Sequence, residues 1–229
     1  MPTGDRSAKP SRDFSGSRSS APGISRVVLV HGLWFRSWAM WRVGAQLRRA
    51  NFQTVGFSYS TTHQDLQRQV DKLFRFARLP GGELPHFVAH SMGGLITLQM
   101  LIQHREIPSG RIVLLGSPIQ GSAVAQRLSE LPGGRIALGE AERTLIRGMD
   151  DWPAERDIGM IAGTRAFGLG ALAGGARSPG DGTVLASESR HEALDDHIEM
   201  PVTHTSMLLS GKVARQTISF LRNGRFDHE

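Results

Sequence analysis

Hydrophobic residues along this chain fall into short continuous runs that alternate with longer segments in which apolar and polar positions are mixed. The first run, RVVLV at 26–30, is rich in β-branched residues and ends at a His-Gly pair, which is typical of a buried strand. The segment at 65–79 instead spaces its apolar residues three or four positions apart, as one face of a helix requires. Strands and helices are therefore predicted to alternate.

The same reading extends over most of the chain. Strands are predicted at 26–30, 52–59, 85–89, 111–115, 157–162 and 192–200. Helices are predicted at 38–50, 65–79, 92–104 and 207–223. Because most of these elements are joined by short connections, the pattern predicts an α/β fold with a mostly parallel, doubly wound sheet flanked by helices.

Three stretches depart from this alternation. Between 116 and 157 the sequences LPGGR and GEAERTLIRG predict two short helices over the end of the sheet, which we interpret as a small cap at about 119–152. The Gly-rich stretch 163–182 is predicted to be a long loop. Residues 1–25 are rich in Ser, Arg, Pro and Gly and are predicted to form a disordered tail, which leaves a single domain at 26–229.

Composition narrows the possible chemistry. The 229 residues, 39% of them hydrophobic, suffice for one domain with a sizeable core. The chain has no cysteine, which excludes disulfides, a cysteine nucleophile and thiolate metal sites. The first 25 residues lack the apolar core of a secretory signal, and no apolar run reaches the roughly 18 residues of a membrane span. We expect a cytoplasmic protein without stable membrane insertion.

The net charge of +6 permits weak attraction to anionic surfaces. The positive residues are mostly Arg and are spread along the chain, without a Lys/Arg-rich run or a known nucleic-acid module. We therefore expect no nucleic-acid partner.

The sequence Ala89-His90-Ser91-Met92-Gly93-Gly94 lies between a predicted strand and a predicted helix. A nucleophile at such a sharp turn needs small residues two positions before and after it, and Ala89 and Gly93 are small. The segment resembles the G-x-S-x-G nucleophile elbow of α/β-hydrolases, with Ala in place of the first Gly. The resemblance implies that Ser91 is the nucleophile; the alternative is an ordinary helix N-cap.

Two loop segments resemble bacterial lipases and esterases of the same superfamily. His31-Gly32-Leu33-Trp34 is similar to the HG-x segment that supplies an oxyanion-hole amide, which implies the backbone N–H groups of Leu33 and Met92 as donors. The sequence GSPIQGS at 116–122 is similar to T-P-x-x-G-S, a loop that shapes the acyl pocket. The candidate substrate-pocket residues are His31, Gly32, Trp34, His90 and Pro118.

A serine nucleophile needs a base and a carboxylate that orients the base. In this superfamily the order along the chain is Ser, then acid, then His. The sequence GDGTV at 180–184 resembles the D-G-x-V segment of the lipase acid, which implies Asp181; an Asp-Gly turn is the alternative. His204 lies between the last predicted strand and helix and is the candidate base, with His191 and His197 as competitors beside or in the strand.

Two other patterns lack the spacing or position of the motifs to which they were compared, a zinc helix and a dinucleotide loop. The residues His191, Glu192, Asp195, Asp196 and His197 do not have the His-Glu-x-x-His spacing of a zinc helix. The glycines at 168, 170, 174 and 175 do not open a helix after the first strand, as a dinucleotide loop does. We expect no metal and no dissociable cofactor.

The resemblance spans about residues 26–222 and implies a serine esterase or small lipase that cleaves small-molecule or lipid esters of short to medium acyl chains. Thioesterases, amidases and acyltransferases use the same three residues, so they stay open as alternatives. A ligand-binding module on a non-catalytic hydrolase fold is an alternative of another class. The sequence carries no signal for an oligomeric state.

Overall fold

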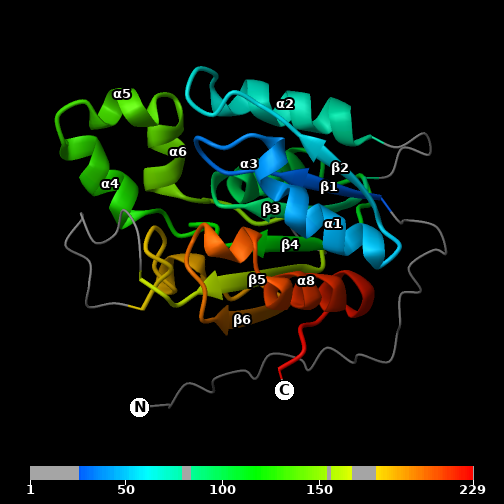
Figure 1. Ribbon diagram of the computed structural model, residues 1–229. Helices are drawn as coiled ribbons and strands as arrows, with labels where there is room; N and C mark the ends of the chain where they lie inside the picture. The colour runs from blue at the N-terminus through cyan, green and yellow to red at the C-terminus, as the bar shows by residue number, and fades with distance from the viewer. Residues whose placement is uncertain (1–25, 79–83, 154–155, 167–178, 229) are drawn as a thin grey trace, which may run out of the picture.

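The computed structural model describes residues 26–78, 84–153, 156–166 and 179–228 (Figure 1). Six strands form one sheet in the order β2-β1-β3-β4-β5-β6, and every neighbouring pair is parallel. The strands are β1 (Arg26–Val30), β2 (Gln53–Phe57), β3 (His86–His90), β4 (Ile112–Leu115), β5 (Ile158–Gly163) and β6 (Asp196–Met200). The predicted α/β fold with a parallel, doubly wound sheet is confirmed. The predicted tail at 1–25 and most of the predicted Gly-rich loop lie outside the described residues.

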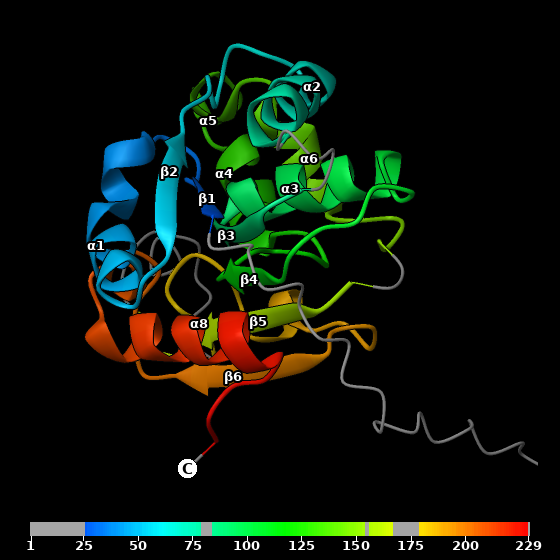
Figure 2. The same ribbon diagram turned by 90° about the vertical axis from the view of Figure 1, so that its right-hand side faces the viewer.

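Helices cover both faces of this sheet. The long helices are α1 (Trp41–Arg49), α2 (Leu66–Ala77), α3 (Met92–Gln103) and α8 (Gly211–Asn223). Helices α1 and α8 pack together on one face, and α2 and α3 pack together on the other (Figure 2). Short 3-10 helices are η1 (Ser37–Met40), η2 (Ser187–Ser189) and η3 (Ser206–Leu208).

The central strands are hydrophobic on both sides because helices cover both sides. Successive residues of a strand point to opposite faces of the sheet. In β1, Val28 and Val30 belong to the hydrophobic cluster beneath α2 and α3. Val27 and Leu29 belong to the cluster beneath α1 and α8. This two-sided burial explains why the strands appear in the sequence as continuous apolar runs.

Three short helices, where two were predicted, lie at the end of the sheet to which the strands point (Figure 1). They are α4 (Ala123–Glu130), α5 (Gly134–Leu138) and α6 (Ala141–Arg147). Gly133 and Gly139 separate them with φ of 77° and 55°, a left-handed backbone that glycine adopts without strain. The Ser122 hydroxyl accepts a hydrogen bond from Ala125 N–H at 3.1 Å and begins α4.

Two predicted boundaries near the C-terminus are wrong, for local reasons. Strand β6 begins at Asp196 instead of 192, and the Asp195 carboxylate just before it accepts a hydrogen bond from Ile158 N–H at 2.8 Å. Helix α8 begins at Gly211 instead of 207 because Ser210 caps it by accepting from Val213 N–H at 3.3 Å.

The carboxyl ends of parallel strands meet at one edge of a sheet, where loops from distant parts of the sequence come together. Here the loops after β1, β3, β4 and β6 reach that edge, next to α4, α5 and α6. Among the helices of the described segments, none combines the length and apolar character needed to cross a bilayer.

Candidate active site

Ser91 occupies a sharp turn between β3 and α3. Its backbone has φ 54° and ψ −127°, a conformation that side-chain-bearing residues rarely adopt. The turn is held because Ser91 N–H donates to the Leu115 carbonyl at 2.9 Å and Gly94 N–H donates to the Ser91 carbonyl at 2.9 Å. Strain of this kind marks positions where the surrounding structure fixes a side chain for a purpose.

The glycine two residues after Ser91 is required by close packing. A Cβ atom at Gly93 would lie 2.5 Å from the His31 carbonyl oxygen and 2.7 Å from the Val30 carbonyl oxygen. Both distances are below any real contact, so α3 can approach β1 only if this position has no side chain. The small-residue requirement inferred from the sequence therefore has a direct steric cause at Gly93.

Asp181 and His204 form a buried pair. His204 Nδ1 lies 2.7 Å from Asp181 Oδ2, and the Asp181 side chain is 1% exposed. The other carboxylate oxygen accepts hydrogen bonds from Thr183 N–H at 2.9 Å and Val184 N–H at 2.7 Å. The His204 N–H also donates to the Asp181 carbonyl at 2.9 Å. These bonds fix both loops and leave His204 Nε2 as the free ring nitrogen of the pair.

A glycine at the end of β4 makes room for this pair. Gly116 has φ 55°, and a Cβ atom there would lie 2.8 Å from Asp181 Oδ2 and 3.2 Å from His204 Nδ1. The predicted role of the 116–122 segment was to shape the acyl pocket. The geometry gives its first residue another role, which is to leave space for the carboxylate and imidazole.

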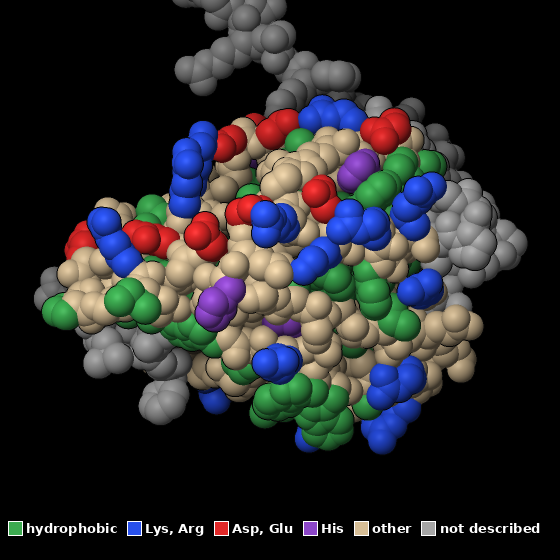
Figure 3. Space-filling model, turned by 90° about the horizontal axis from the view of Figure 1, so that it is seen from above, with side chains coloured by type: hydrophobic (Ala, Val, Ile, Leu, Met, Phe, Trp, Pro, Cys, Tyr) green, Lys and Arg blue, Asp and Glu red, His purple; other side chains and the backbone are tan. Residues whose placement is uncertain are grey.

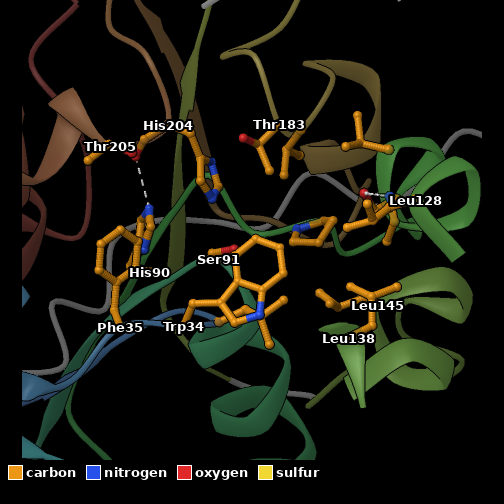
Figure 4. A pocket seen from close by; sticks show the side chains of 16 residues that line it. Trp34, Phe35, His90, Ser91, Leu128, Leu138, Leu145, Thr183, His204 and Thr205 are labelled. Carbon is orange, nitrogen blue, oxygen red and sulfur yellow. Dashed lines mark hydrogen bonds between the residues drawn. The ribbon is translucent and has the colours of Figure 1, made fainter. Parts of the chain in front are cut away.

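His90, directly before Ser91, packs behind His204. Its Nε2 lies 3.0 Å from the His204 carbonyl oxygen, and the two rings lie 4.5 Å apart (Figure 4). Burial first, and the neighbouring His204 second, hold the pKa of His90 well below its ordinary value. His90 is therefore neutral near pH 7, with its proton on Nε2.

The loop after β1 is held by His31. Its ring stacks on Tyr59 at 4.3 Å, the Tyr59 hydroxyl donates to the His31 carbonyl at 2.6 Å, and His31 Nδ1 lies 2.9 Å from the Gly32 carbonyl. Burial lowers the pKa of His31, which keeps the ring neutral. His31 and Gly32, two of the predicted substrate-pocket residues, are not among the residues that line the cavity described next.

Leu33 and Met92, the two predicted oxyanion donors, follow two adjacent strands of the sheet. Leu33 follows β1, Met92 is the first residue of α3, and β1 pairs with β3. The first amides of a helix have no intrahelical acceptor, so Met92 N–H is available to a ligand. Neighbouring amides shape the loop: Trp34 N–H donates to Thr61 Oγ1 at 3.2 Å and Phe35 N–H to the Gly32 carbonyl at 3.3 Å.

A cavity of about 200 Å³ opens in front of Ser91 and His204 (Figure 4). Trp34, His90 and Pro118, three of the predicted pocket residues, line it. Five apolar side chains of its lining come from α4, α5 and α6. The complete lining is Leu33, Trp34, Phe35, His90, Ser91, Pro118, Ser122, Val124, Ala125, Leu128, Leu138, Leu145, Thr183, Val184, His204 and Thr205.

Trp34 connects two parts of this cavity. Its backbone has φ 61°, and its indole Nε1–H donates to the Ala137 carbonyl in α5 at 2.9 Å. The indole lies in front of Ser91 in Figure 4, while its backbone directly follows Leu33. This hydrogen bond ties the loop after β1 to helix α5.

Glu188 is a site residue that sequence reasoning missed. It is buried, and its carboxylate accepts hydrogen bonds from Ala123 N–H at 2.7 Å and Leu185 N–H at 2.8 Å. It thereby ties the start of α4 to the loop that follows Asp181. Burial raises the pKa of Glu188. Its sequence context, Ser-Glu-Ser, is that of a solvated turn, so no local signal marks it.

The competing histidines lie elsewhere. His191 stacks on Trp152 at 4.3 Å, and His197 lies within β6 with its pKa lowered by burial. Neither lines the cavity that Ser91 and His204 share. Among the residues that the structure describes, no group of three or more His, Asp or Glu side chains is arranged to hold a metal ion.

Residues 27–214 match the Alpha/beta hydrolase family. Similar solved structures include the mature lipase BlEst2 of Bacillus licheniformis, with a TM-score of 0.72, 21% identity and coverage of 89% of this chain and 93% of that chain. The metagenomic carboxyl esterase MGS0156 has a TM-score of 0.62, 18% identity and coverage of 87% and 74%. Tomato methylketone synthase I complexed with 2-tridecanone has a TM-score of 0.54, 14% identity and coverage of 86% and 96%. No curated protein matches the chain in sequence. These likenesses show a shared fold, and the family match, which covers most of the chain, shows that it belongs to the alpha/beta hydrolase family.

Proposed function

We propose that this hydrolase cleaves carboxylic esters with Ser91 as nucleophile, His204 as base and Asp181 as the acid that orients the base. One observation carries the proposal. The strained Ser91 turn and His204 line the same cavity, and His204 Nδ1 is held 2.7 Å from a buried carboxylate. The family and the lipase and carboxyl esterase among the similar structures support the same class of reaction.

The first step is proton transfer during attack. Since Asp181 only accepts, His204 carries its proton on Nδ1, and the Nε2 lone pair is free to take the Ser91 proton. Ser91 Oγ attacks the ester carbonyl, His204 returns the proton to the leaving alcohol, and an acyl-serine forms. Water then attacks the acyl-serine by the same route, which releases the acid and restores Ser91.

The oxyanion of each tetrahedral intermediate needs hydrogen-bond donors that are already in place. Leu33 N–H and Met92 N–H serve this role in the proposal, because they flank Ser91 from the loop after β1 and from the start of α3. One such donor is worth about 3 to 4 kcal/mol in the transition state. The hydrogen bonds of Trp34 and Tyr59 keep the first of these loops in place.

The acyl group fits the apolar side of the cavity. Leu128, Leu138 and Leu145 come from α4, α5 and α6 in turn, so residues 119–152 act as the cap that covers the acyl chain. A volume of about 200 Å³ favours short to medium acyl chains. Among the described residues, no Asp, Glu, Lys or Arg side chain lines this cavity, which favours uncharged esters.

The proposal is tested with p-nitrophenyl acetate, butyrate and octanoate. We expect Ser91→Ala to lower kcat by about 10⁴-fold or more, and Asp181→Asn to lower it by about 10⁴-fold because the amide favours the wrong His204 tautomer. Ser219→Ala, which removes a hydroxyl on α8 that bonds the Arg225 carbonyl, is the matched control and should retain activity. Retained hydrolysis in Ser91→Ala would contradict the proposal.

The same assay separates the alternatives. A butyryl thioester compared with the oxygen ester measures the preferred leaving group, and added alcohol measures transfer against hydrolysis. A higher kcat/KM for the thioester would reassign the substrate and keep the three residues. Absence of turnover with every acyl donor, in a folded protein that still binds the ester, would instead support a ligand-binding module.

A further inference from the structure

The positive charge of this protein is concentrated on one face. Two described segments, 26–64 and 200–226, contain no Asp or Glu. Their basic residues are Arg26, Arg36, Arg42, Arg48 and Arg49 in the first, and Lys212, Arg215, Arg222 and Arg225 in the second. These nine charges exceed the net charge of +6 of the whole chain, so the rest of the chain is net negative.

The two segments form one surface because α1 and α8 pack side by side on the same face of the sheet. Arg222 Nη2, from the end of α8, donates to the Ala50 carbonyl at the end of α1 at 2.9 Å. The ion pairs of the described residues use other arginines, such as Arg111 and Arg190. The α1–α8 face comprises η1, α1, Leu209 and α8. Six of the nine basic residues lie in it, form no ion pair with other described residues and are available to an external partner: Arg42, Arg48, Arg49, Lys212, Arg215 and Arg222.

Large apolar side chains project from the same face. Trp38 is 68% exposed and Trp41 is 56% exposed, three residues apart at the junction of η1 and α1. Leu209, two residues before α8, is also exposed. In Figure 3 the half of the molecule on the side of α1 shows hydrophobic and basic side chains without acidic ones, and the other half shows acidic and basic side chains together. Exposed tryptophans among basic residues suit the boundary between water and lipid, where an indole has both apolar and polar neighbours.

The α1–α8 face adjoins the cavity. Leu33, Trp34 and Phe35 line the cavity, and the chain then runs directly into η1. On the other side, Thr205 lines the cavity and lies four residues before Leu209. A flat partner bound to this face would therefore lie beside the opening in front of Ser91.

We propose that the α1–α8 face docks on the surface of an anionic lipid bilayer. The basic residues would be attracted to anionic headgroups, and Trp38, Trp41 and Leu209 would enter the interface between headgroups and acyl chains. A double-stranded nucleic acid would use the same positive charge and would have no need of the exposed indoles. Docking of this face on a bilayer does not depend on hydrolysis. Delivery of lipid-borne esters to the cavity, in contrast, rests on the proposed function.

The test uses the full chain with Ser91→Ala, so that hydrolysis cannot change the lipid. Binding is measured by sedimentation with vesicles of phosphatidylcholine alone and with about a third of phosphatidylglycerol added. We expect the protein to bind the vesicles that contain phosphatidylglycerol and not those of phosphatidylcholine alone. Binding should shift the tryptophan fluorescence to the blue and should be lost at high salt. Equal binding to neutral vesicles, or no binding to either, would overturn the proposal.

Matched variants locate the surface. Lys212→Gln with Arg215→Gln, on α8, should weaken vesicle binding by at least about tenfold. Lys72→Gln with Arg75→Gln makes the same change at the same spacing on α2, on the other face of the sheet, and should leave binding unchanged. Trp38→Ser with Trp41→Ser should also lose binding. Ile136→Ser, which changes an 86% exposed residue outside this face, should not.

The outcomes separate this proposal from the proposed function. The α8 and tryptophan variants, made with Ser91 intact, should hydrolyse a soluble butyrate ester like the wild type, because none of these residues lines the cavity. Vesicle binding would survive even if Ser91 proved not to be the nucleophile. Binding to double-stranded DNA as strong as binding to anionic vesicles, and unaffected by the tryptophan changes, would overturn the lipid assignment.

Discussion

His90 Nε2 lies 3.0 Å from the carbonyl oxygen of His204, a residue 114 positions later in the chain. A carbonyl oxygen only accepts hydrogen bonds, so Nε2 carries the proton. His90 Nδ1 is buried without a partner among the described residues, which suits a neutral ring. The residue before the proposed nucleophile thus holds the backbone of the proposed base, in an arrangement that needs His90 uncharged.

This contact predicts that His90 acts as a positioning residue. His90→Gln places an amide N–H near the same carbonyl, whereas His90→Leu leaves the carbonyl without a donor. We expect His90→Leu to lower kcat for p-nitrophenyl butyrate by about tenfold with little change in KM, and His90→Gln to restore most of the loss. Equal activity of the two variants would show that the hydrogen bond has no role in positioning.

Buried neutral histidines also predict a pH dependence of stability. Burial lowers the pKa values of His31 and His90 below their ordinary value of 6.5. Below that pH the unfolded chain binds protons that the folded chain excludes, so stability falls as the pH falls. Each such group contributes up to about 1.4 kcal/mol per pH unit.

The measurement is urea unfolding at about pH 7.5 and about pH 5.5. The wild type should lose stability at the lower pH. His90→Gln should lose less, because its unfolded chain has no imidazole at position 90 to bind a proton. Glu188 works in the opposite direction, since its raised pKa weakens the fold as the pH rises above 4.5. An identical loss in wild type and His90→Gln would show that His90 does not cause the acid sensitivity.

Gly116 predicts a steric effect on the proposed site. An alanine methyl would lie 2.8 Å from Asp181 Oδ2 and would push the carboxylate away from His204. Gly133→Ala is the matched control, since it also has positive φ but no atom within 4 Å of the added methyl. Both variants should lose about 1 kcal/mol of stability to backbone strain. Only Gly116→Ala should lose kcat, by about tenfold or more, because only there does the methyl meet the Asp181–His204 pair.

The Trp34 indole predicts coupling between the loop after β1 and α5. Trp34→Phe keeps an aromatic ring and removes the N–H that bonds the Ala137 carbonyl. Amide hydrogen exchange in α5 should become about fivefold faster, equivalent to the loss of one hydrogen bond of about 1 kcal/mol. Trp38→Phe makes the same chemical change outside the cavity and should leave α5 unchanged. Unchanged exchange in Trp34→Phe would mean that α5 is held by its other contacts.

The fold could be predicted because its central strands are buried on both faces. Runs such as VVLV within β1 and IVLL at β4 are apolar from end to end and are bounded by polar or glycine residues. Boundaries were missed where a side chain formed a bond that the local pattern does not reveal, as at Asp195 and Ser210. The third short helix was missed because Gly133 and Gly139 look like one glycine-rich connection in the sequence.

The candidate site could be predicted only where a residue carries a local signature. Ser91 lies in a strand-turn-helix pattern whose steric rule is visible in the sequence. The roles of Glu188, Tyr59 and Gly116 could not be predicted because they depend on partners far away in the chain. Tyr59, for example, bonds the His31 carbonyl across 28 residues. Such contacts arise from the fold, and no local sequence pattern predicts them.

The central claim is that Ser91 is a nucleophile activated by His204. The most direct test is labelling of the full chain with a fluorophosphonate, followed by peptide mass spectrometry, in the wild type, Ser91→Ala, His204→Asn and the control His228→Asn. We expect one adduct on Ser91 in the wild type and in His228→Asn, and none in Ser91→Ala or His204→Asn. An adduct on another residue, or labelling of Ser91 that persists in His204→Asn, would contradict the claim.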